Sequence, residues 1–502
     1  MAGIATVNNG DLMAEHGYIA VDLGAESGRV MLARVGPAGV MLQEMHRFAN
    51  GPVNAGGTLY WDALRLWSEI QAGIAKTTAE NPNISGIGLD TWGVDFGLID
   101  GHGQLIGNPT HYRDARTRGM IDKVYANLPR EKVYGITGIQ TMELNTLFQL
   151  AAVAAKTPET LARAKTLLFM PDLFAYWLTG RCTNEYTIAS TSQMLDARQR
   201  QWSSDILAAI GIPPSLFAEM VIPCTGNSVI GPVQRDIGET LRADGVPVLA
   251  VGSHDTASAV AAVPATGDDW LYLSSGTWSL LGAEVAQPVL DSRAMRYNLT
   301  NEGGVGGTIR LLKNIAGLWL LQECRRAWAR QGKEFEYRTL VQLAREEPGH
   351  TALLNLEDPG FGAPGDMPGK IAEHCRRTGQ PIPETPGRFT RIILESLAVT
   401  YHHVRLMLEE VTGRKFNKLH IVGGGSQNEL LNQMAADATG LTVFAGPVEA
   451  TALGNAIAQA MAVGQIASLA EARALVAKTV NLRTYQPVET QRWQDWIKRR
   501  AG

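Results

Sequence analysis

Residues 18–33 read Tyr-Ile-Ala-Val-Asp-Leu-Gly-Ala-Glu-Ser-Gly-Arg-Val-Met-Leu-Ala. An apolar run ends in glycine, a short polar turn follows, and a second apolar run begins at Val30, which is the pattern of a β-hairpin. Residues 270–282, Trp-Leu-Tyr-Leu-Ser-Ser-Gly-Thr-Trp-Ser-Leu-Leu-Gly, repeat this build. The repetition indicates an internal duplication, with two related halves that each open on a hairpin.

Alternating helix and strand signals follow the first hairpin. Asp62 can cap a helix whose apolar residues recur at helical spacing. These residues are Leu64, Trp67, Ile70 and Ile74. Short buried runs at residues 84–90 and 246–251 are typical of strands. This alternation predicts an α/β fold.

The pattern restarts after a loop of turn-forming residues at 264–269. We therefore expect a break near residue 264 between two related domains. The predicted segments are a flexible N-terminal extension (1–16), an N-terminal domain (17–264), a C-terminal domain (265–465) and a helical tail (466–502).

Three features of the second half bear on function. We expect an amphipathic helix over residues 313–330, with Lys313, Asn314 and Gln322 near its start. A glycine run at 423–425 joins a predicted strand to a predicted helix. A helix of small residues from 449 to 458 is suited to close contact with another helix.

Composition excludes several classes of protein. The 502 residues carry 45 Lys and Arg against 49 Asp and Glu, so no basic excess is present to bind nucleic acid. No apolar stretch is long enough for a membrane span, and the first residues lack the pattern of a signal peptide. Four widely spaced cysteines indicate a reducing compartment, and we expect a cytoplasmic protein.

The hairpin turns are candidate phosphate sites. Backbone N–H groups in such turns form concave anion sites, and Asp22 at the strand end can hold a hydrated Mg²⁺. Each turn taken alone is equally compatible with an ordinary hairpin turn that binds nothing. Two such turns, one from each duplicated half, can however bind one triphosphate between them. The glycine run at 423–425 can lie flat against a nucleotide or form only a tight turn. The chain contains no P-loop motif.

His254-Asp255-Thr256 follows a predicted strand and precedes a helix. A carboxylate there can take a proton from a substrate hydroxyl, although an Asp that caps the helix would look the same. Trp92 and Asp95 end another strand. This polar and aromatic pair suits a sugar, or it is a buried tryptophan beside a capped turn.

The chain from about 18 to 465 resembles the FGGY carbohydrate kinases. Six motifs carry the resemblance. They are Val21-Asp-Leu-Gly-Ala-Glu-Ser-Gly-Arg-Val30, Asp90-Thr-Trp-Gly-Val-Asp-Phe96, Gly252-Ser-His-Asp-Thr-Ala-Ser-Ala259, Ser274-Ser-Gly-Thr-Trp-Ser279, Asn301-Glu-Gly-Gly304 with Leu312-Lys-Asn-Ile315, and Ile421-Val-Gly-Gly-Gly-Ser-Gln-Asn428.

The resemblance implies a two-domain actin-like (ribonuclease-H-like) ATPase fold with a duplicated core. MgATP would bind in the cleft between the domains, and closure would exclude water. The catalytic base would be Asp255, and Asp22 would hold Mg²⁺ through water. The residues implied for ATP binding are Ala25, Glu26, Ser27, Gly28, Arg29, Thr277, Gln322 and Gly424. Those implied for sugar binding are Gly93, His254, Asp255, Thr256 and Asn314.

Within the family, the resemblance is strongest to enzymes that phosphorylate the C1 hydroxyl of L-rhamnulose. A kinase for another ketose, such as L-fuculose, is an alternative, because a few side chains decide which hydroxyl configuration fits. A non-catalytic, ATP-dependent sensor or chaperone-like protein is a further alternative, against which the intact 254–256 motif argues. We expect a monomer or a homodimer.

Glu26 departs from the family pattern, which usually has a small hydroxyl residue there. A carboxylate that faces phosphates repels them by about 1 kcal/mol at 4 Å in water and by more in a drier site. We therefore expect Glu26 to point outward or to act through Mg²⁺, or else nucleotide affinity to be weakened.

Overall fold

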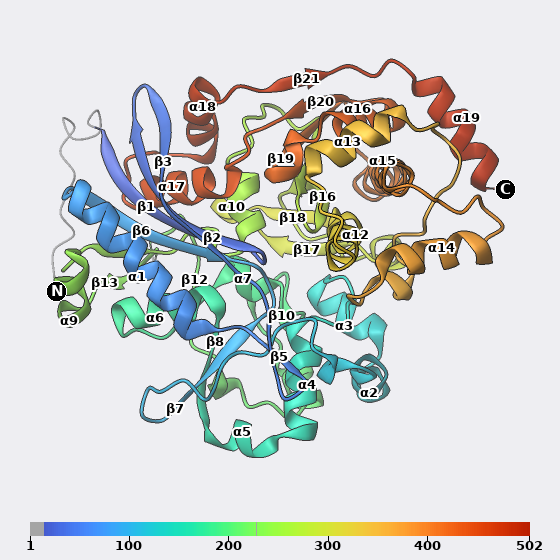
Figure 1. Cartoon of the computed structure of the whole chain (residues 1–502). Coiled ribbons are helices and arrows are strands. Elements are labelled where there is room, and N and C mark those ends of the chain that lie inside the picture. The colour runs from blue at the N-terminus through green and yellow to red at the C-terminus, as the bar shows by residue number, and fades with distance from the viewer. Residues whose placement is uncertain (1–14, 227, 502) are drawn as a thin grey trace. The chain divides into compact units, whose positions relative to one another are not determined.

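The computed structural model describes residues 15–226 and 228–501, which form two compact units (Figure 1). Unit 1 contains residues up to 264 together with 284–311 and 450–480, and unit 2 contains 265–283, 312–449 and 481 onward. The predicted N-terminal extension lies outside the described residues except for its last two. The first strand already begins at His16, two residues earlier than the apolar run suggests. The division into four segments stays a prediction.

The sheet of unit 1 has six strands in the order β13–β14–β6–β1–β2–β3. Their bounds are Val229–Pro232 (β13), Pro247–Leu249 (β14), Ile84–Thr91 (β6), His16–Leu23 (β1), Ser27–Gly36 (β2) and Gly39–Ala49 (β3). β14, β6 and β1 run parallel to one another, whereas the β13–β14, β1–β2 and β2–β3 pairs are antiparallel.

The second sheet has seven strands in the order β17–β18–β16–β15–β19–β20–β21. Their bounds are Thr300–Gly303 (β17), Ile309–Ile315 (β18), Ser279–Val285 (β16), Trp270–Ser275 (β15), Lys418–Val422 (β19), Thr442–Ala445 (β20) and Arg483–Tyr485 (β21). β15 pairs antiparallel with β16 and parallel with β19, which in turn pairs parallel with β20.

The two sheets repeat one topology. In each, an antiparallel hairpin lies beside two successive parallel strands, and the outermost of these has an antiparallel neighbour, β13 or β21. Such agreement over the central strands is what an internal duplication produces. The predicted two-domain α/β fold with a duplicated core is confirmed.

Helices α1 (Ala63–Glu80) and α17 (Ala450–Ala462) cover opposite faces of the unit 1 sheet (Figure 1). Val30 lies against Gly73 of α1, while its neighbour Met31 packs with α17, as the alternation of a strand requires. The approach of α17 is close because β6 is rich in glycine. A Cβ on Gly88 would lie 2.4 Å from Oδ1 of Asn455.

Unit 1 holds these further elements: β4 (Val53–Ala55), β5 (Thr58–Tyr60), β7 (Phe96–Asp100), α2 (Met120–Asn127), α3 (Arg130–Thr137), α4 (Thr146–Lys156), α5 (Pro158–Arg163), β8 (Ala164–Phe169), α6 (Met170–Thr179), β9 (Thr183–Glu185), α7 (Tyr186–Ser190), β10 (Leu195–Asp196), β11 (Gln201–Trp202), α8 (Ser204–Ala209), β12 (Glu219–Val221), α9 (Arg235–Leu241), α10 (Asp255–Ala261), α11 (Ser292–Arg296) and α18 (Leu469–Thr479). Unit 2 holds α12 (Trp319–Arg330), α13 (Tyr337–Glu346), α14 (Met367–Arg377), α15 (Pro386–Thr412), α16 (Glu429–Thr439) and α19 (Thr490–Ala501).

Two local expectations were wrong. The helix predicted over 313–330 begins only at Trp319, so Lys313 and Asn314 lie on strand β18. The helix starts late because the backbone N–H groups of Leu318 and Trp319 bond to carbonyls of the 276–277 turn, a contact that local sequence does not encode. Leu64, expected on the buried face of α1, is 63% exposed, and Leu66 is buried in its place.

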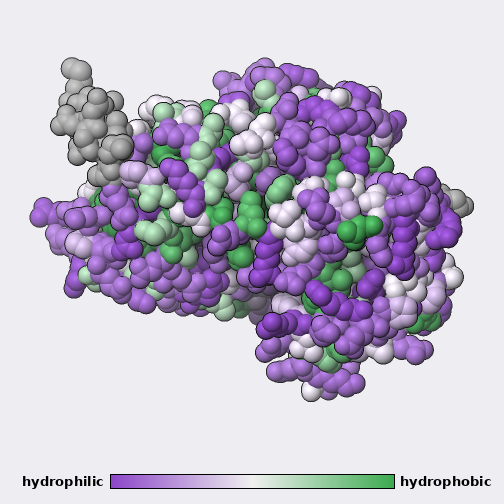
Figure 2. Space-filling model, turned by 90° about the horizontal axis from the view of Figure 1, so that it is seen from above, coloured by the Kyte–Doolittle hydropathy of each residue, from purple (hydrophilic) through white to green (hydrophobic). Residues whose placement is uncertain are grey.

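Within the described part of the chain, no helix is both long and apolar enough to cross a bilayer. The face seen in Figure 2 is largely hydrophilic, with hydrophobic side chains in small separate groups. The four cysteines are free thiols.

Candidate active site

The carboxyl ends of the parallel strands in unit 1 bring several acidic side chains together. Asp22 on β1 stands in register with Asp90 on β6. Just beyond, Thr91 forms a parallel bridge with His254, which precedes α10. Asp255, the first residue of that helix, is therefore placed beside the two strand-end carboxylates, as expected for parallel strands that end at one edge.

Asp22 and Asp90 are each held by a different partner. Arg29 donates to Oδ2 of Asp22 from Nε at 2.9 Å and from Nη2 at 2.6 Å. Asp90 is fully buried and accepts a 2.6 Å hydrogen bond from Nδ2 of Asn455 on α17. Burial and the neighbouring Asp22 raise the pKa of Asp90 well above its ordinary value.

Asp255 has the properties of a general base. Burial raises the pKa of its carboxyl above the ordinary value, Asp22 adds to the rise, and His254 opposes it. The side chain keeps 29% of its surface exposed, and the Thr256 hydroxyl donates to its Oδ1 at 3.1 Å. A carboxylate that is both accessible and more basic than usual can accept a hydroxyl proton at neutral pH.

His254 lies against a buried ion pair to which the sequence analysis assigned no role. Nη2 of Arg310 is 3.0 Å from Nδ1 of His254 and 3.1 Å from Oε2 of Glu302. Glu302 belongs to the 301–304 motif of the family resemblance, which was the only sequence signal for it. Arg310 on β18 carries no such signal, because its partners lie far away along the chain.

The loop that contains Gly93 is strained. Val94 has a φ of 67°, a conformation that a β-branched residue adopts rarely and at a cost. Thr191 and Thr146 fix this backbone, since Oγ1 of Thr191 accepts from the Val94 N–H at 3.2 Å and Oγ1 of Thr146 donates to its carbonyl at 2.7 Å. A Cβ on Gly93 would lie 3.3 Å from Nε2 of His254. Gly93 and His254, which the resemblance assigns to the sugar, are thus brought together, and their role stays a prediction.

Asp95 supports this loop from the interior. Its carboxylate accepts from the indole N–H groups of Trp61 (2.6 Å) and Trp92 (3.0 Å) and from the side chain of Gln149 (2.9 Å). Burial raises its pKa to about 6. Because these protein donors occupy both oxygens, the buried-tryptophan interpretation of Trp92 and Asp95 agrees better with the structure than a direct sugar contact.

The turn over residues 25–29 is a tight one. The Gly24 N–H donates to the Ser27 carbonyl at 2.9 Å, and the side-chain amide of Asn50 donates to the Gly24 carbonyl at 2.8 Å. Gly28 is closely packed, since a Cβ there would lie 2.4 Å from the ring of Phe48, which would have to move. The Glu26 side chain is exposed.

In unit 2, three of the residues assigned to ATP gather at one sheet edge. The 276–278 turn after β15 adjoins the 423–427 segment after β19, since these strands are parallel neighbours. Nε2 of Gln322 donates to Oγ1 of Thr277 at 3.0 Å. A Cβ on Gly424 would meet no atom within 4 Å, so this glycine borders open space. Asn314, which was assigned to the sugar, lies on strand β18, one residue before its end.

The carboxylate set of unit 1 fits a weakly held magnesium ion. Oxygen ligands suit Mg²⁺, which usually keeps several waters and binds one or two carboxylates together with substrate phosphates. Oδ1 of Asp90 has no hydrogen-bond partner within the described residues, which leaves one acceptor beside Asp22. No cluster of three or more acidic, histidine or cysteine ligands occurs in that same part of the chain. The donor set therefore suits a water-mediated ion and not a fully protein-caged one.

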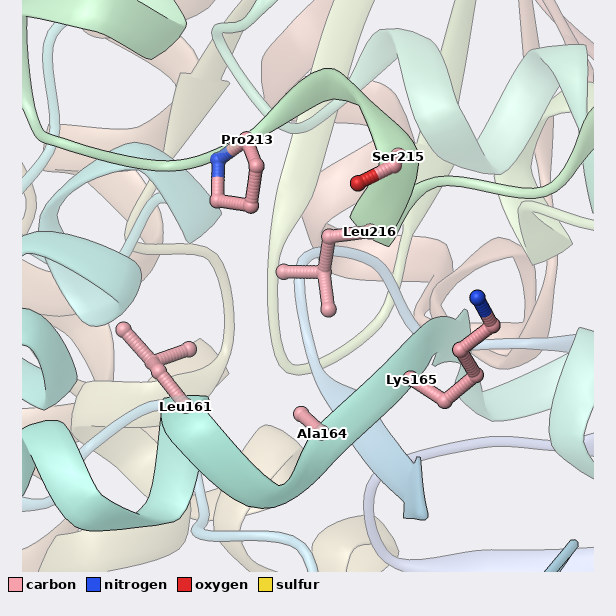
Figure 3. A pocket seen from close by; sticks show the side chains of 6 residues that line it. All are labelled: Leu161, Ala164, Lys165, Pro213, Ser215 and Leu216. Atoms are coloured by element: carbon pink, nitrogen blue, oxygen red, sulfur yellow. The ribbon is translucent and has the colours of Figure 1, made fainter. Parts of the chain in front are cut away.

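A cavity of about 200 Å³ lies elsewhere in unit 1 (Figure 3). Its lining contains none of the predicted site residues and consists of Leu161, Ala164, Lys165, Pro213, Ser215 and Leu216. With one basic side chain and otherwise small or apolar groups, it lacks the convergent polar groups of a sugar site.

Comparisons with known proteins agree with this geometry. Residues 17–262 match the model of the N-terminal domain of the FGGY family of carbohydrate kinases, and residues 271–463 match that of its C-terminal domain. A rhamnulokinase of Bacteroides thetaiotaomicron is 43% identical over 476 residues, which cover 95% of this chain and 97% of that protein. A rhamnulokinase of Enterococcus faecalis is 40% identical over 490 residues, or 96% and 97% of the two chains.

Solved structures extend the likeness to the fold. A ligand-bound xylulose kinase from Lactobacillus acidophilus superposes with a TM-score of 0.79 at 16% identity, over 97% of both chains. A Plasmodium falciparum glycerol kinase with ADP gives a TM-score of 0.76 at 14% identity, also over 97% of both chains. At such low identity these structures support the fold and leave the substrate open.

Proposed function

The chain belongs to the FGGY family of carbohydrate kinases, and from this premise we propose that it transfers the γ-phosphoryl group of ATP to the C1 hydroxyl of L-rhamnulose, giving L-rhamnulose 1-phosphate and ADP. Near full-length similarity to two rhamnulokinases supports the sugar. The observation that supports phosphoryl transfer is that Asp255 has an accessible carboxylate of raised pKa. Asp255 lies beside His254, which in turn lies close to Gly93.

In this mechanism Asp255 accepts the proton of the C1 hydroxyl as that oxygen attacks the γ-phosphorus and ADP leaves. His254, Thr256, Gly93 and Asn314 orient the sugar. Ala25, Glu26, Ser27, Gly28 and Arg29, together with Thr277, Gln322 and Gly424, bind the nucleotide. Asp22 holds Mg²⁺ through water, and the ion, when bound, offsets the charge that develops on the phosphates.

Asp255→Asn tests the assignment of the base. Asparagine keeps the size of the side chain but cannot accept the proton, so we expect turnover to fall by about 10²–10⁴-fold. Binding of ATP and of the sugar, measured by titration calorimetry, should stay within a few fold of the wild-type protein. Near-wild-type turnover would remove Asp255 from the role of base.

A coupled ADP-release assay with MgATP tests the sugar. The panel contains L-rhamnulose, L-fuculose, L-ribulose, D-xylulose and glycerol. A clear preference for L-rhamnulose would support the proposal, whereas preference for L-fuculose or another ketose would keep the mechanism and change the substrate. ADP release without any dependence on sugar would contradict the kinase function and favour a sensor or chaperone-like role.

The setting of the enzyme is part of the same proposal. Four free thiols and ATP as the phosphoryl donor agree with a cytoplasmic location. We expect a monomer or a homodimer, which sedimentation at several protein concentrations distinguishes.

A further inference from the structure

A buried triad of His254, Glu302 and Arg310 lies behind the candidate base in unit 1. The side chain of Arg310 is fully buried, and those of Glu302 and His254 are 5% and 9% exposed. Besides its contact with Arg310, Glu302 places Oε2 3.3 Å from Nδ1 of His254. Burying two opposite charges is costly and stabilises a fold little, so a buried pair that contacts a site residue calls for a functional explanation.

The donors and acceptors of the triad decide where the histidine proton resides. A guanidinium group only donates and stays protonated in proteins. The contact of Arg310 Nη2 with Nδ1 of His254 has the geometry of a hydrogen bond at 3.0 Å, so Nδ1 must be the acceptor. A neutral imidazole that accepts at Nδ1 carries its proton on Nε2.

The backbone around the triad fixes Arg310 in this position. Nε of Arg310 donates to the carbonyl of Gly303 at 2.9 Å. The N–H of Gly303 in turn donates to Oγ of Ser190 at 2.8 Å, and a Cβ at Gly303 would lie 2.4 Å from the ring of Tyr186. β17 is thereby tied to α7, and the guanidinium group has little freedom to turn away from His254.

Nε2 of His254 faces the reacting groups. It lies 3.5 Å from Oδ1 of Asp255 and near the position that a side chain on Gly93 would occupy. An N–H at this atom is a hydrogen-bond donor for a carboxylate or a sugar hydroxyl.

We propose that Glu302 and Arg310 are positioning residues that hold His254 as the neutral imidazole with its proton on Nε2, so that it donates toward Asp255 and the sugar. The proposal rests on the proposed function only in the identity of the acceptors. The protonation state of His254 itself can be measured without any substrate.

The direct test is ¹⁵N NMR of the full chain labelled at histidine. The signals of His254 are assigned by their loss in His254→Asn. At neutral pH we expect the wild-type protein to show a protonated Nε2 and an unprotonated Nδ1, and Arg310→Gln to lose this preference. A proton on Nδ1 of the wild-type protein, or a doubly protonated ring, would overturn the proposal, whether or not the protein phosphorylates any sugar.

Kinetics test whether the pair acts through the histidine. We expect Glu302→Gln to lower kcat for the sugar by at least about 10-fold while KM for ATP changes little. In the His254→Asn background the same substitution should cause no further loss. An equal additional loss would mean that Glu302 acts independently of His254 and would refute the proposal.

Two controls separate positioning from folding. The double variant Glu302→Gln/Arg310→Gln removes both charges together and leaves no unpaired charge, so it tests the same loss of kcat in a protein that retains its fold. Glu284→Gln breaks a comparable ion pair of the same unit, in which Arg473 Nη2 lies 2.6 Å from Glu284 Oε2. An equal loss of kcat in Glu284→Gln would assign the effect to stability and overturn the proposal.

Discussion

Gly454→Ala adds one methyl group where helices α17 and α10 pack together in unit 1. The new Cβ would lie 1.7 Å from the carbonyl oxygen and 2.9 Å from Cα of Ser258. Non-bonded heavy atoms rest about 3.5–4.0 Å apart, so the two helices must separate by more than about 1 Å. The neighbour is backbone, which cannot rotate away as a side chain would.

The cost follows from this forced separation. Overpacking of this kind destabilises by about 1–3 kcal/mol, and alanine recovers less than about 1 kcal/mol of it through its better helix propensity. Ser258 lies one helical turn after Asp255 on α10, so the shift reaches the candidate base. A misplacement of about 1 Å at a reacting group can lower the rate about 10²-fold.

Thermal unfolding and steady-state kinetics together measure both effects. Gly135→Ala is the matched control, because Gly135 lies within α3 and a Cβ there meets no atom within 4 Å. We expect the control to keep its activity and to gain about 0.5–1 kcal/mol in stability. Wild-type stability and turnover in Gly454→Ala would refute the close packing. A loss of stability with unchanged turnover would refute the link to Asp255.

Three further predictions concern buried or paired polar groups. Burial raises the pKa of Asp95 in the folded protein to about 6, so between about pH 4 and 6 the folded state keeps a proton that the unfolded chain loses. The free energy of unfolding should therefore fall by roughly 3 kcal/mol as the pH rises from about 4 to 6. In urea unfolding across this pH range, the free energy of unfolding should fall less in Asp95→Asn than in the wild-type protein. An unchanged fall would show that Asp95 is not the group that titrates. Arg29→Met leaves the buried Asp22 carboxylate unpaired and should lower the free energy of unfolding by up to about 3–5 kcal/mol. Adding Asp22→Asn in a double variant should restore most of this loss. No recovery in chemical unfolding would argue against the ion pair. Gln322→Leu removes the hydrogen bond to Thr277 and should weaken ADP binding, measured by calorimetry, by about 5-fold. KM for the sugar should not change. Wild-type affinity for ADP would exclude Gln322 from the nucleotide site.

The fold was readable from sequence because its deciding signals are local. The hairpins at 18–33 and 270–282 each combine apolar runs with a glycine turn, and the structure has both of them. The helix of small residues after 449 was expected to pack closely on another helix, and Gly454 meets α10 as that pattern indicates. These features need only neighbouring residues to be recognised.

The parts that failed depend on distant contacts. Asn314 was placed at the start of an amphipathic helix predicted over 313–330, but hydrogen bonds to the 276–277 turn set the start of α12 at Trp319. Arg310 and Asn455 were missed for the same reason. Their partners, His254 and Asp90, lie tens to hundreds of residues away along the chain, and a single sequence read by itself cannot reveal such pairs.

The duplicated sheets end in turns of different chemistry, and the difference follows from charge. The strand ends of unit 1 carry carboxylates at Asp22, Asp90 and Asp255. Burial raises the pKa of Asp90 and that of Asp255, and the nearby Asp22 carboxylate adds to both rises. The corresponding ends in unit 2 carry hydroxyl groups and glycines, among them Thr277 and Gly424. A carboxylate can accept a proton but repels a triphosphate, whereas neutral N–H and O–H donors bind an anion without that repulsion. One topology can therefore serve two roles once its halves diverge at the turns. In the proposed mechanism, the base and several of the nucleotide-binding residues accordingly lie at or just after strand ends.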